Sequence, residues 1–184
     1  MDLNRGAERA AVPLDAGHHG LLAAEFRRVG QPDPSADARR YFAAQLGIET
    51  VADWRELLGK VDVVSVCSPA STHAEIVRAF LSAGANVLVE KPIATDIDEA
   101  EELIALAAAK GLTLTVGHQE RYVFAKSGLL DFNDAPLYVE CVRAGPWTGR
   151  GADVSVVLDL MIHDLDIVLS LTGEPVVDVA AVGV

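Results

Sequence analysis

The chain has 184 residues, enough for one large domain or for one domain and part of a second. Fifteen Lys and Arg against 27 Asp and Glu give a formal net charge of −12. This charge repels phosphate backbones and anionic lipid surfaces, so we expect neither nucleic acid nor a membrane as a partner. The first residues lack the apolar core of a signal sequence, and no apolar run approaches the roughly 20 residues that span a bilayer. We therefore expect a cytoplasmic protein.

The N-terminal third is expected to hold one weak strand and two helices. Residues 10–14 are apolar, but Pro13 removes a hydrogen-bond donor from any central strand. Residues 21–28 have the composition of a helix. After two prolines, Ser35 is a typical cap for a second helix that runs to about residue 46. No strand is expected between these two helices.

The middle of the chain alternates buried strands with amphipathic helices, which is the pattern of βαβ units on a parallel sheet. It predicts an α/β fold of the Rossmann type. The expected strands are residues 61–66, 85–90 and 112–116, and the expected helices are residues 50–58, 74–81 and a longer one from about 95 to 110.

The pattern changes after Tyr122, so we expect a first domain at 1–122 and part of a second at 123–184. Residues 136–144 alternate apolar and polar side chains like a half-exposed antiparallel strand. Residues 155–172 are predicted to be helical, and residues 175–184 to form a last strand.

A lysine follows the apolar run 85–90, in the order Glu90-Lys91-Pro92. A buried strand that ends there delivers one long cationic side chain to the carboxyl edge of the sheet, where open α/β folds bind ligands. A lysine in that place is suited to hydride or proton chemistry on a hydroxyl group.

Two turns have the position of cofactor-binding loops. Residues 15–20 precede a helix as a dinucleotide-binding glycine loop does, but Asp15 stands where the first glycine belongs, so an ordinary turn is the stronger interpretation. Residues 67–73 follow a buried strand, so their hydroxyls and amides point where a ribose or phosphate could lie. The alternative is a simple turn in which Ser71 or Thr72 caps the next helix, and both interpretations are compatible.

Asp159, His163 and Asp166 have i, i+4 and i+7 spacing, which places them on one face of the apolar helix 155–172. A carboxylate beside an imidazole fixes its tautomer and suits it to act as a general base. A solvated face, a metal pair and a satisfied buried cluster are alternatives that spacing leaves open. The two cysteines, Cys67 and Cys141, form neither a disulfide framework nor a metal motif, and we expect no bound metal.

Three motifs in this order, Cys67-Ser68-Pro69 with Thr72-His73, then Glu90-Lys91-Pro92, then Asp159-x-x-x-His163, resemble those of the Gfo/Idh/MocA oxidoreductases. The resemblance implies a Rossmann domain followed by an α/β substrate domain that often forms an oligomer interface, here a homo-oligomer. It also implies NAD or NADP as the cofactor and a sugar or nucleotide sugar as the substrate.

The resemblance assigns roles to individual residues. Lys91 would contact the reacting hydroxyl, His163 would be the acid or base, and Asp159 would bind substrate or support His163. Cofactor contacts would come from Gly17, His18, His19, Ser68, Pro69, Thr72, His73, Glu90 and Lys91, while His118 and Gln119 would flank the nicotinamide. The runs 117–121 and 153–164 look most like members that oxidise the 3-hydroxyl of UDP-N-acetylglucosamine.

The chain also departs from the family. The family's second strand is expected to be missing, because the 11 residues between Gly20 and Pro32 accommodate only one helix. With it goes the residue that binds the adenosine ribose, for which only Gln31 or Asp33 is near, so NAD and NADP stay open. The sequence also ends before the family's second sheet is complete. An inactive truncated relative that acts as a binding or oligomerisation module is therefore the alternative function.

Overall fold

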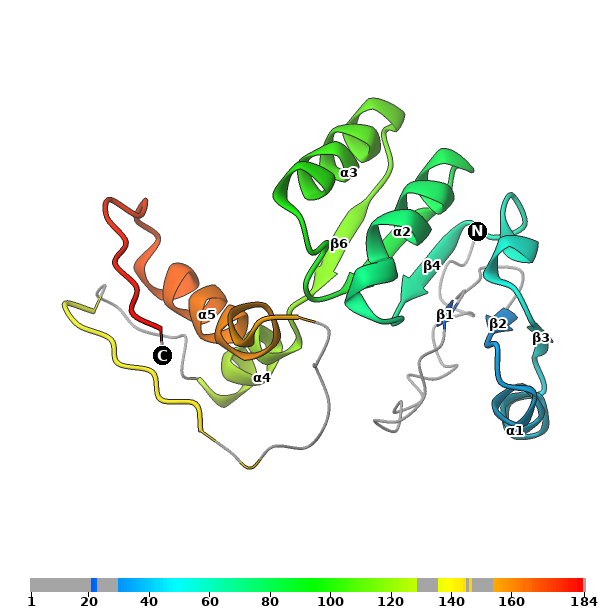
Figure 1. Ribbon diagram of the computed structural model, residues 1–184, viewed down its shortest axis with the longest axis horizontal. Coiled ribbons are helices and arrows are strands. Elements are labelled where there is room, and N and C mark those ends of the chain that lie inside the picture. Colours follow the sequence, from blue (N-terminus) through cyan, green and yellow to red (C-terminus); the bar gives the residue numbers. More distant parts are fainter. Residues whose placement is uncertain (1–20, 23–29, 129–135, 145, 147–153, 184) are drawn as a thin grey trace, which may run out of the picture. The chain divides into compact units, whose positions relative to one another are not determined.

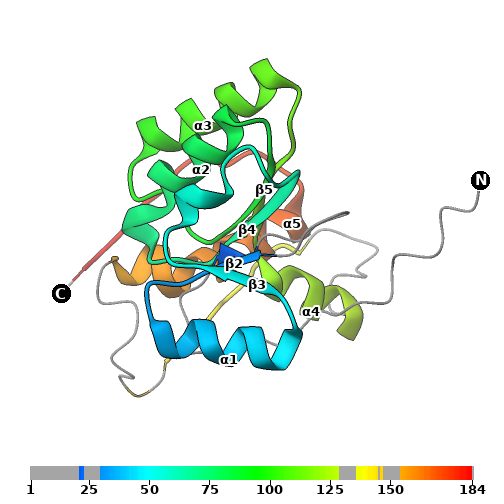
Figure 2. The ribbon, with the colours of Figure 1, turned by 90° about the vertical axis from the view of Figure 1, so that its right-hand side faces the viewer.

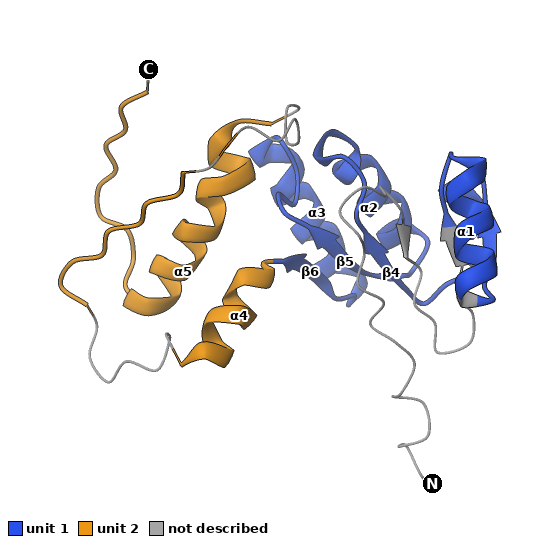
Figure 3. Cartoon of the chain, turned by 90° about the horizontal axis from the view of Figure 1, so that it is seen from below, with its two compact units in different colours: residues 1–117 blue, residues 118–184 orange. Residues whose placement is uncertain are grey.

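The computed structural model describes residues 21–22, 30–128, 136–144, 146 and 154–183 (Figure 1). The chain divides into two compact units, residues 1–117 and 118–184 (Figure 3). The division follows a strand and precedes a helix, five residues before the expected change after Tyr122. The weak strand at 10–14 and the loop at 15–20 lie outside the described residues.

The first unit is built on three parallel neighbouring strands, β4 (Val63–Val66), β5 (Asn86–Glu90) and β6 (Leu114–Gly117). A short strand, β1 (Leu21–Leu22), adds to β4 in the antiparallel direction. The three parallel strands and the Rossmann-like α/β fold are confirmed. Each strand begins one or two residues later than expected.

Two helices cover one face of this sheet, α2 (His73–Ser82) and α3 (Ile97–Lys110) (Figure 2). The start of α3 is fixed by Asp96, whose carboxylate accepts hydrogen bonds from the backbone of residues 98 and 99 at 2.8 and 3.2 Å. Gly111 ends it at φ 65°, in the left-handed region that favours glycine. Both ends agree with the sequence.

The core lies between the sheet and these helices. Its side chains are fully or almost fully buried, and they come from β4, β5, α2 and α3: Val64, Val66, Val77, Phe80, Leu81, Val87, Val89 and Leu103. Each such side chain contributes about 1.5–3 kcal/mol by leaving water. The opposite face is less covered, since Leu88 is 41% exposed.

A second, two-stranded sheet corrects the expectation of a missing strand. Strand β2 (Gly30–Pro32) pairs in parallel with β3 (Glu49–Val51). The three residues of β2 need far less chain than a typical strand, and its proline is tolerated because β2 has only one strand partner. The expected helix at 21–28 is also wrong at its start, because Leu21 and Leu22 form β1.

The helix α1 (Ala36–Leu46) links β2 to β3 and is confirmed. Ser35 caps it by accepting a hydrogen bond from the backbone N–H of Ala38 at 3.3 Å, and Gly47 ends it at φ 64°. In Figure 2, α1 lies on the opposite side of the strands from α2 and α3. The expected helix at 50–58 is reduced to a single 3₁₀ turn, η1 (Trp54–Leu57), because β3 takes its first residues.

The second unit contains α4 (Gln119–Ser127), a π-helical turn η3 (Val157–Met161) and α5 (Ile162–Thr172). Helix α4 was not expected, whereas η3 and α5 confirm the helix predicted at 155–172. Several apolar side chains of this helical stretch are exposed: Val156, Leu165 and Leu169 to 64, 46 and 48%. Among the described helices of the chain, none is both long and apolar enough to cross a membrane.

The two strands expected in the second unit are wrong. Residues 136–144 and 175–183 are irregular. Alternating apolar and polar side chains indicate that one face of a segment is apolar. A strand also needs a neighbouring strand to pair with its backbone N–H and C=O groups. Within the described part of this unit no segment pairs with either one.

The packing of α3 predicts a contrast between two adjacent residues. Replacing buried Leu103 by Ala should lower the free energy of unfolding of the first unit by about 2–5 kcal/mol, because it leaves a cavity in the core. Ile104→Ala is the matched control: with 57% of the side chain exposed, it should change the free energy by about 0.5 kcal/mol or less. Native-state hydrogen exchange at the β5 amides measures both, and equal effects would contradict the assigned core.

Candidate functional site

The parallel strands of the first unit bring several polar residues to the carboxyl ends of the strands. Ser68 follows β4, Glu90 and Lys91 stand at the end of β5, and Asp33 follows β2. The register of β5 and β6 places Glu90 opposite Gly117. Ligands of open α/β sheets bind at this edge, so we describe it residue by residue.

Asp33 is buried, with 4% of its surface exposed, and several bonds fix it. Its carboxylate accepts a hydrogen bond from the backbone N–H of Ser35 at 2.7 Å, and its own N–H donates to the carbonyl of Val51 at 3.1 Å. Arg39 donates to its carbonyl oxygen at 2.5 Å. A carboxylate has about four acceptor positions, so the same group can also accept hydrogen bonds from a ligand's hydroxyls.

A pocket of about 480 Å³ opens beside Asp33. Its walls come from the ends of β2 and β3, from η1 and from the turn that follows β4: Pro32, Asp33, Pro34, Ala52, Trp54, Arg55, Ser68, Pro69, Thr72, Glu75 and Ile76. The volume falls within the range of small-molecule sites, about 300–1,000 Å³. Its polar lining comes from one buried acid, two hydroxyl side chains and the ion pair of Arg55 with Glu75, and the acid and hydroxyls suit a sugar ring.

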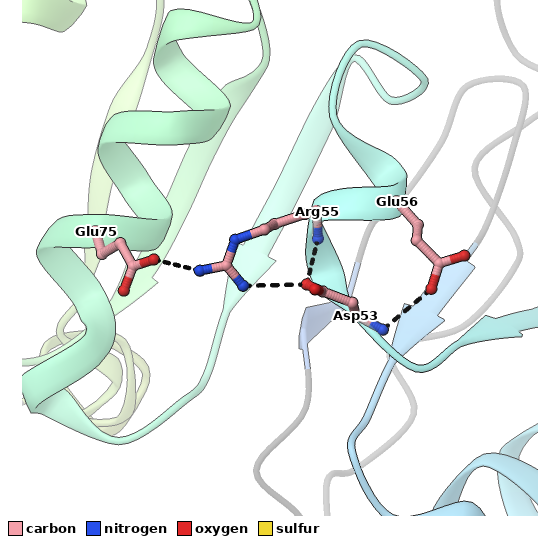
Figure 4. A network of polar contacts seen from close by, with 4 residues as sticks. All are labelled: Asp53, Arg55, Glu56 and Glu75. Carbon is pink, nitrogen blue, oxygen red and sulfur yellow. Dashed lines mark hydrogen bonds and ion pairs between the residues drawn. The ribbon is translucent and has the colours of Figure 1, made fainter.

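An ion-pair network forms one wall of this pocket (Figure 4). Arg55 pairs with Asp53 in its own turn and with Glu75 of α2. Asp53 and Glu56 form a capping box, in which the side chain of each accepts a hydrogen bond from the backbone N–H of the other. The Arg55 guanidinium also lies 4.3 Å from the centre of the Trp54 ring. The positive charge of Arg55 is thus already matched by two carboxylates.

The turn after β4 is held by its own hydroxyls. The Thr72 hydroxyl oxygen lies 2.7 Å from the Ser68 hydroxyl and 2.7 Å from the carbonyl oxygen of Pro69. Thr72 occupies the cap position of α2, but its side chain bonds no backbone N–H there. The expected side-chain cap at Ser71 or Thr72 is therefore wrong, and the hydroxyls shape the turn instead.

His73 joins the turn after β4 to the turn after β5. It is 1% exposed, and its ring nitrogens lie 2.7 Å from the carbonyl oxygen of Pro92 and 2.9 Å from that of Ser68. The contact with Ser68 lies within the turn after β4, whereas the contact with Pro92 crosses to the turn after β5, so this side chain links the two turns. Its predicted contact with a cofactor stays a prediction.

The end of β5 is packed against the end of β6. A Cβ added to Gly117 would lie 3.1 Å from a carboxylate oxygen of Glu90, so glycine leaves the space that this carboxylate needs. Burial raises the pKa of the nearby Cys67 thiol, which stays a reduced thiol. Lys91 follows directly, partly exposed, and a cis peptide bond joins it to Pro92.

In the second unit, Asp159 lies in the π-helical turn and His163 in the first turn of α5. Short π-helical stretches often occur at functional sites, because they change the direction of side chains within a helix. The Nδ1 atom of His163 is buried. The same helix therefore presents both residues of the Asp-x-x-x-His motif.

Asp166, the third member of the predicted polar face, has a structural partner. Its carboxylate forms a two-pronged ion pair with Arg121 of α4, with Nε and Oδ2 3.0 Å apart. Its side chain is only 10% exposed. For Asp166 this favours the satisfied buried cluster among the alternatives that spacing left open.

A second arginine bridges the same two helices, and sequence reasoning missed it. Arg143 binds Glu120 of α4 and Asp164 of α5. The hydrogen bonds that Arg143 donates to Glu120 and Asp164 are the main reason that the pKa of each carboxyl group lies below the usual value. Arg143 lies in the irregular segment 136–144, 23 residues from one partner and 21 from the other, so no local pattern reveals the contact.

The remaining predicted residues are placed as follows. His118 and Gln119 stand where β6 passes into α4. Gly17, His18 and His19 lie outside the described residues. In the described part of the chain no three His, Cys, Asp or Glu residues gather as a metal site would require.

Comparison with known proteins identifies the family. Residues 7–118 match the Gfo/Idh/MocA profile, described as an oxidoreductase family with an NAD-binding Rossmann fold. The chain belongs to this family. The predicted resemblance is thereby confirmed.

Among curated relatives, UDP-N-acetylglucosamine 3-dehydrogenase of Acidithiobacillus ferrooxidans is 39% identical over 177 residues, which cover 93% of this chain and 56% of that protein. Inositol 2-dehydrogenase of Rhodococcus erythropolis is 33% identical, covering 65% of this chain and 36% of that protein. A solved structure of the Acidithiobacillus enzyme matches with a TM-score of 0.72 over 83% of this chain and 52% of the other. The chain thus spans about half the length of these relatives.

The pocket beside Asp33 fits the adenosine half of a nicotinamide dinucleotide. In Rossmann folds an acidic residue at the end of the second strand accepts hydrogen bonds from the adenosine ribose. Asp33 occupies that place, directly after β2, and its buried carboxylate lines a pocket of suitable size. Of the two candidates near that position, Gln31 and Asp33, Asp33 has the place expected of a ribose ligand.

The position of His73 generates a prediction. A His73→Ala variant removes a buried ring, and with it the hydrogen bond that the ring N–H donates to a backbone carbonyl, so we expect the free energy of unfolding of the first unit to fall by about 2–4 kcal/mol. Arg78→Ala is a control on the same helix, because it removes only an exposed pair with Glu102 and should cost about 1 kcal/mol or less. Chemical denaturation measures the free energy of unfolding of both variants. If His73→Ala loses no more than Arg78→Ala, His73 does not stabilise the first unit in this way.

Proposed function

We propose that the chain provides the cofactor-binding half of an NAD-dependent oxidoreductase acting on a hydroxyl of a sugar or nucleotide sugar. The observation that carries this proposal is the pocket lined both by buried Asp33 and by Ser68 and Thr72 of the turn after β4. Family membership and the sugar dehydrogenases among the relatives support it. The expected cytoplasmic location and homo-oligomer stay predictions.

NAD is the preferred cofactor in this proposal. NADP carries a phosphate on the ribose hydroxyl that Asp33 would bind. A buried carboxylate within hydrogen-bonding reach of that hydroxyl would repel the negative charge of the phosphate. Arg55 is the cation on the pocket wall, and it is already paired with Asp53 and Glu75. The pocket therefore favours two ribose hydroxyls over a ribose phosphate.

The proposed reaction uses residues from the two family motifs. His163 takes the proton of the substrate hydroxyl, and Lys91 stabilises the negative charge that develops on that oxygen. Asp159 binds substrate or supports the imidazole. A bound nicotinamide supplies the acceptor for the hydride. UDP-N-acetylglucosamine is the first substrate to test, because the Acidithiobacillus relative is a UDP-N-acetylglucosamine 3-dehydrogenase.

Cofactor titration tests the assignment of Asp33. We expect NADH to bind more tightly than NADPH, and Asp33→Asn to reduce the NADH preference by about tenfold or more, since each factor of ten corresponds to about 1.4 kcal/mol. Asn keeps an acceptor for the backbone of Ser35 but removes the charge. Asp37→Asn is the matched control, because its side chain is 85% exposed on α1.

Binding is followed by the fluorescence of the reduced cofactor. An unchanged preference in Asp33→Asn would exclude Asp33 as the selecting residue. If neither cofactor binds at millimolar concentration, the enzyme proposal fails, and a non-catalytic binding or oligomerisation module becomes the better description.

Turnover tests His163. If the imidazole is the base, His163→Ala should lower the rate of UDP-N-acetylglucosamine oxidation by about 100-fold or more while NADH affinity stays nearly intact. Leu169→Ala is the control on the same helix, because its side chain is 48% exposed. Loss of both turnover and NADH binding in His163→Ala would show instead that the residue supports the fold.

A further inference from the structure

In the second unit, Arg143 makes four hydrogen bonds to two carboxylates. Its guanidinium donates to both oxygens of Asp164, at 3.1 Å from Nε and 2.9 Å from Nη2. It also donates to both oxygens of Glu120, at 2.9 Å from Nη1 and 2.6 Å from Nη2. One planar cation thus binds two carboxylates with two bonds each, a geometry that lysine cannot reproduce.

The side chains of this contact are partly exposed to solvent. The side chains of Arg143, Glu120 and Asp164 are 32, 31 and 20% exposed. Bidentate pairs in such surroundings hold their geometry better than fully exposed surface pairs. The guanidinium also ties the irregular segment 136–144 to α4 and α5.

Both carboxylates that Arg143 binds act on His163. Asp164 is the next residue along α5, and Arg143 ties Glu120 of α4 to it, so both carboxylates belong to one cluster beside His163 and interact electrostatically with the imidazole. Other charged or titratable groups on these elements are Asp159 one turn earlier, Asp166 with its partner Arg121, Tyr122 and Lys126 of α4, His118 just before α4, and Glu140 in the segment of Arg143. Arg143 and its two partners carry a net charge of −1, and without the arginine the charge would be −2.

We propose that Arg143 is a positioning residue: by holding Glu120 and Asp164 together, it limits their negative charge beside His163 and keeps the imidazole free to take a proton. Two uncompensated carboxylates would draw a proton onto the ring, and a protonated imidazole cannot act as a base. The role in catalysis rests on the proposed function. The effect of Arg143 on the pKa of His163 does not depend on it.

The decisive measurement is an NMR titration of the His163 imidazole in the whole chain, with the signal assigned by a His163→Asn variant. In Arg143→Gln we expect the His163 pKa to rise by about half a unit to one unit, because a nearby positive charge is lost. In Glu120→Gln the same pKa should fall, because a negative charge is lost. Arg143→Lys, which keeps the charge but not the paired hydrogen bonds, should shift the His163 pKa less than Arg143→Gln does.

Arg78→Gln is the control for the loss of an arginine. Arg78 is far from His163 in the sequence and forms an exposed pair with Glu102, so this variant should leave the His163 pKa unchanged. Should Arg143→Gln fail to fold, Glu120→Gln and Arg143→Lys still decide the question. A His163 pKa that does not move in Arg143→Gln or Glu120→Gln would reduce Arg143 to a structural tie and overturn the proposal.

Turnover separates this proposal from the proposed function. If the wild type oxidises a nucleotide sugar, the pH at which Arg143→Gln reaches full kcat should rise by the same amount as its His163 pKa, while Leu169→Ala keeps the wild-type profile. If the wild type shows no turnover and no cofactor binding, the proposed function fails, and the titration still confirms or overturns the effect of Arg143 on His163.

Discussion

The parallel pairing of β4, β5 and β6 is the constraint on which the first unit depends. Its ladder aligns Val66 with Val89, and Glu90 with Gly117, so the three strands end at one edge. Burial of one face locks this register, because a shift by one residue would turn Val89 outward and Leu88 into the core. The positions of the turns that carry Ser68 and Lys91 are thus a consequence of hydrophobic packing.

The two units hold their polar residues in different ways. At the sheet edge, His73 uses neutral backbone carbonyls as partners, and its near-complete burial makes each contact costly to lose. In the second unit, Arg121 and Arg143 use charged partners on two helices that bury little apolar surface. Where a core is extensive, geometry comes from packing; where it is thin, multidentate ion pairs take over this role.

The parts of the fold that the sequence predicted are those with local causes. Helix α3 has its cap at Asp96, its stop at Gly111 and its apolar period within a single stretch of chain. Strand β2 was missed because three residues carry almost no periodicity, and its partner β3 begins 17 residues beyond its end. The same reason hid Arg143, whose partners are distant in sequence. Of the candidate site, the motif residues were therefore predictable, whereas their neighbours were not.

The acidic composition and a dinucleotide ligand are compatible because recognition is local. A net charge of −12 disfavours long anionic polymers, whose many phosphates each meet the field of the whole protein. A dinucleotide presents its ribose hydroxyls as hydrogen-bond donors, and a carboxylate such as Asp33 is a strong acceptor for them. The neutralised Arg55 adds no attraction for an extra phosphate. In the proposed function, Asp33 is thus the group that would distinguish a bare ribose from a phosphorylated one.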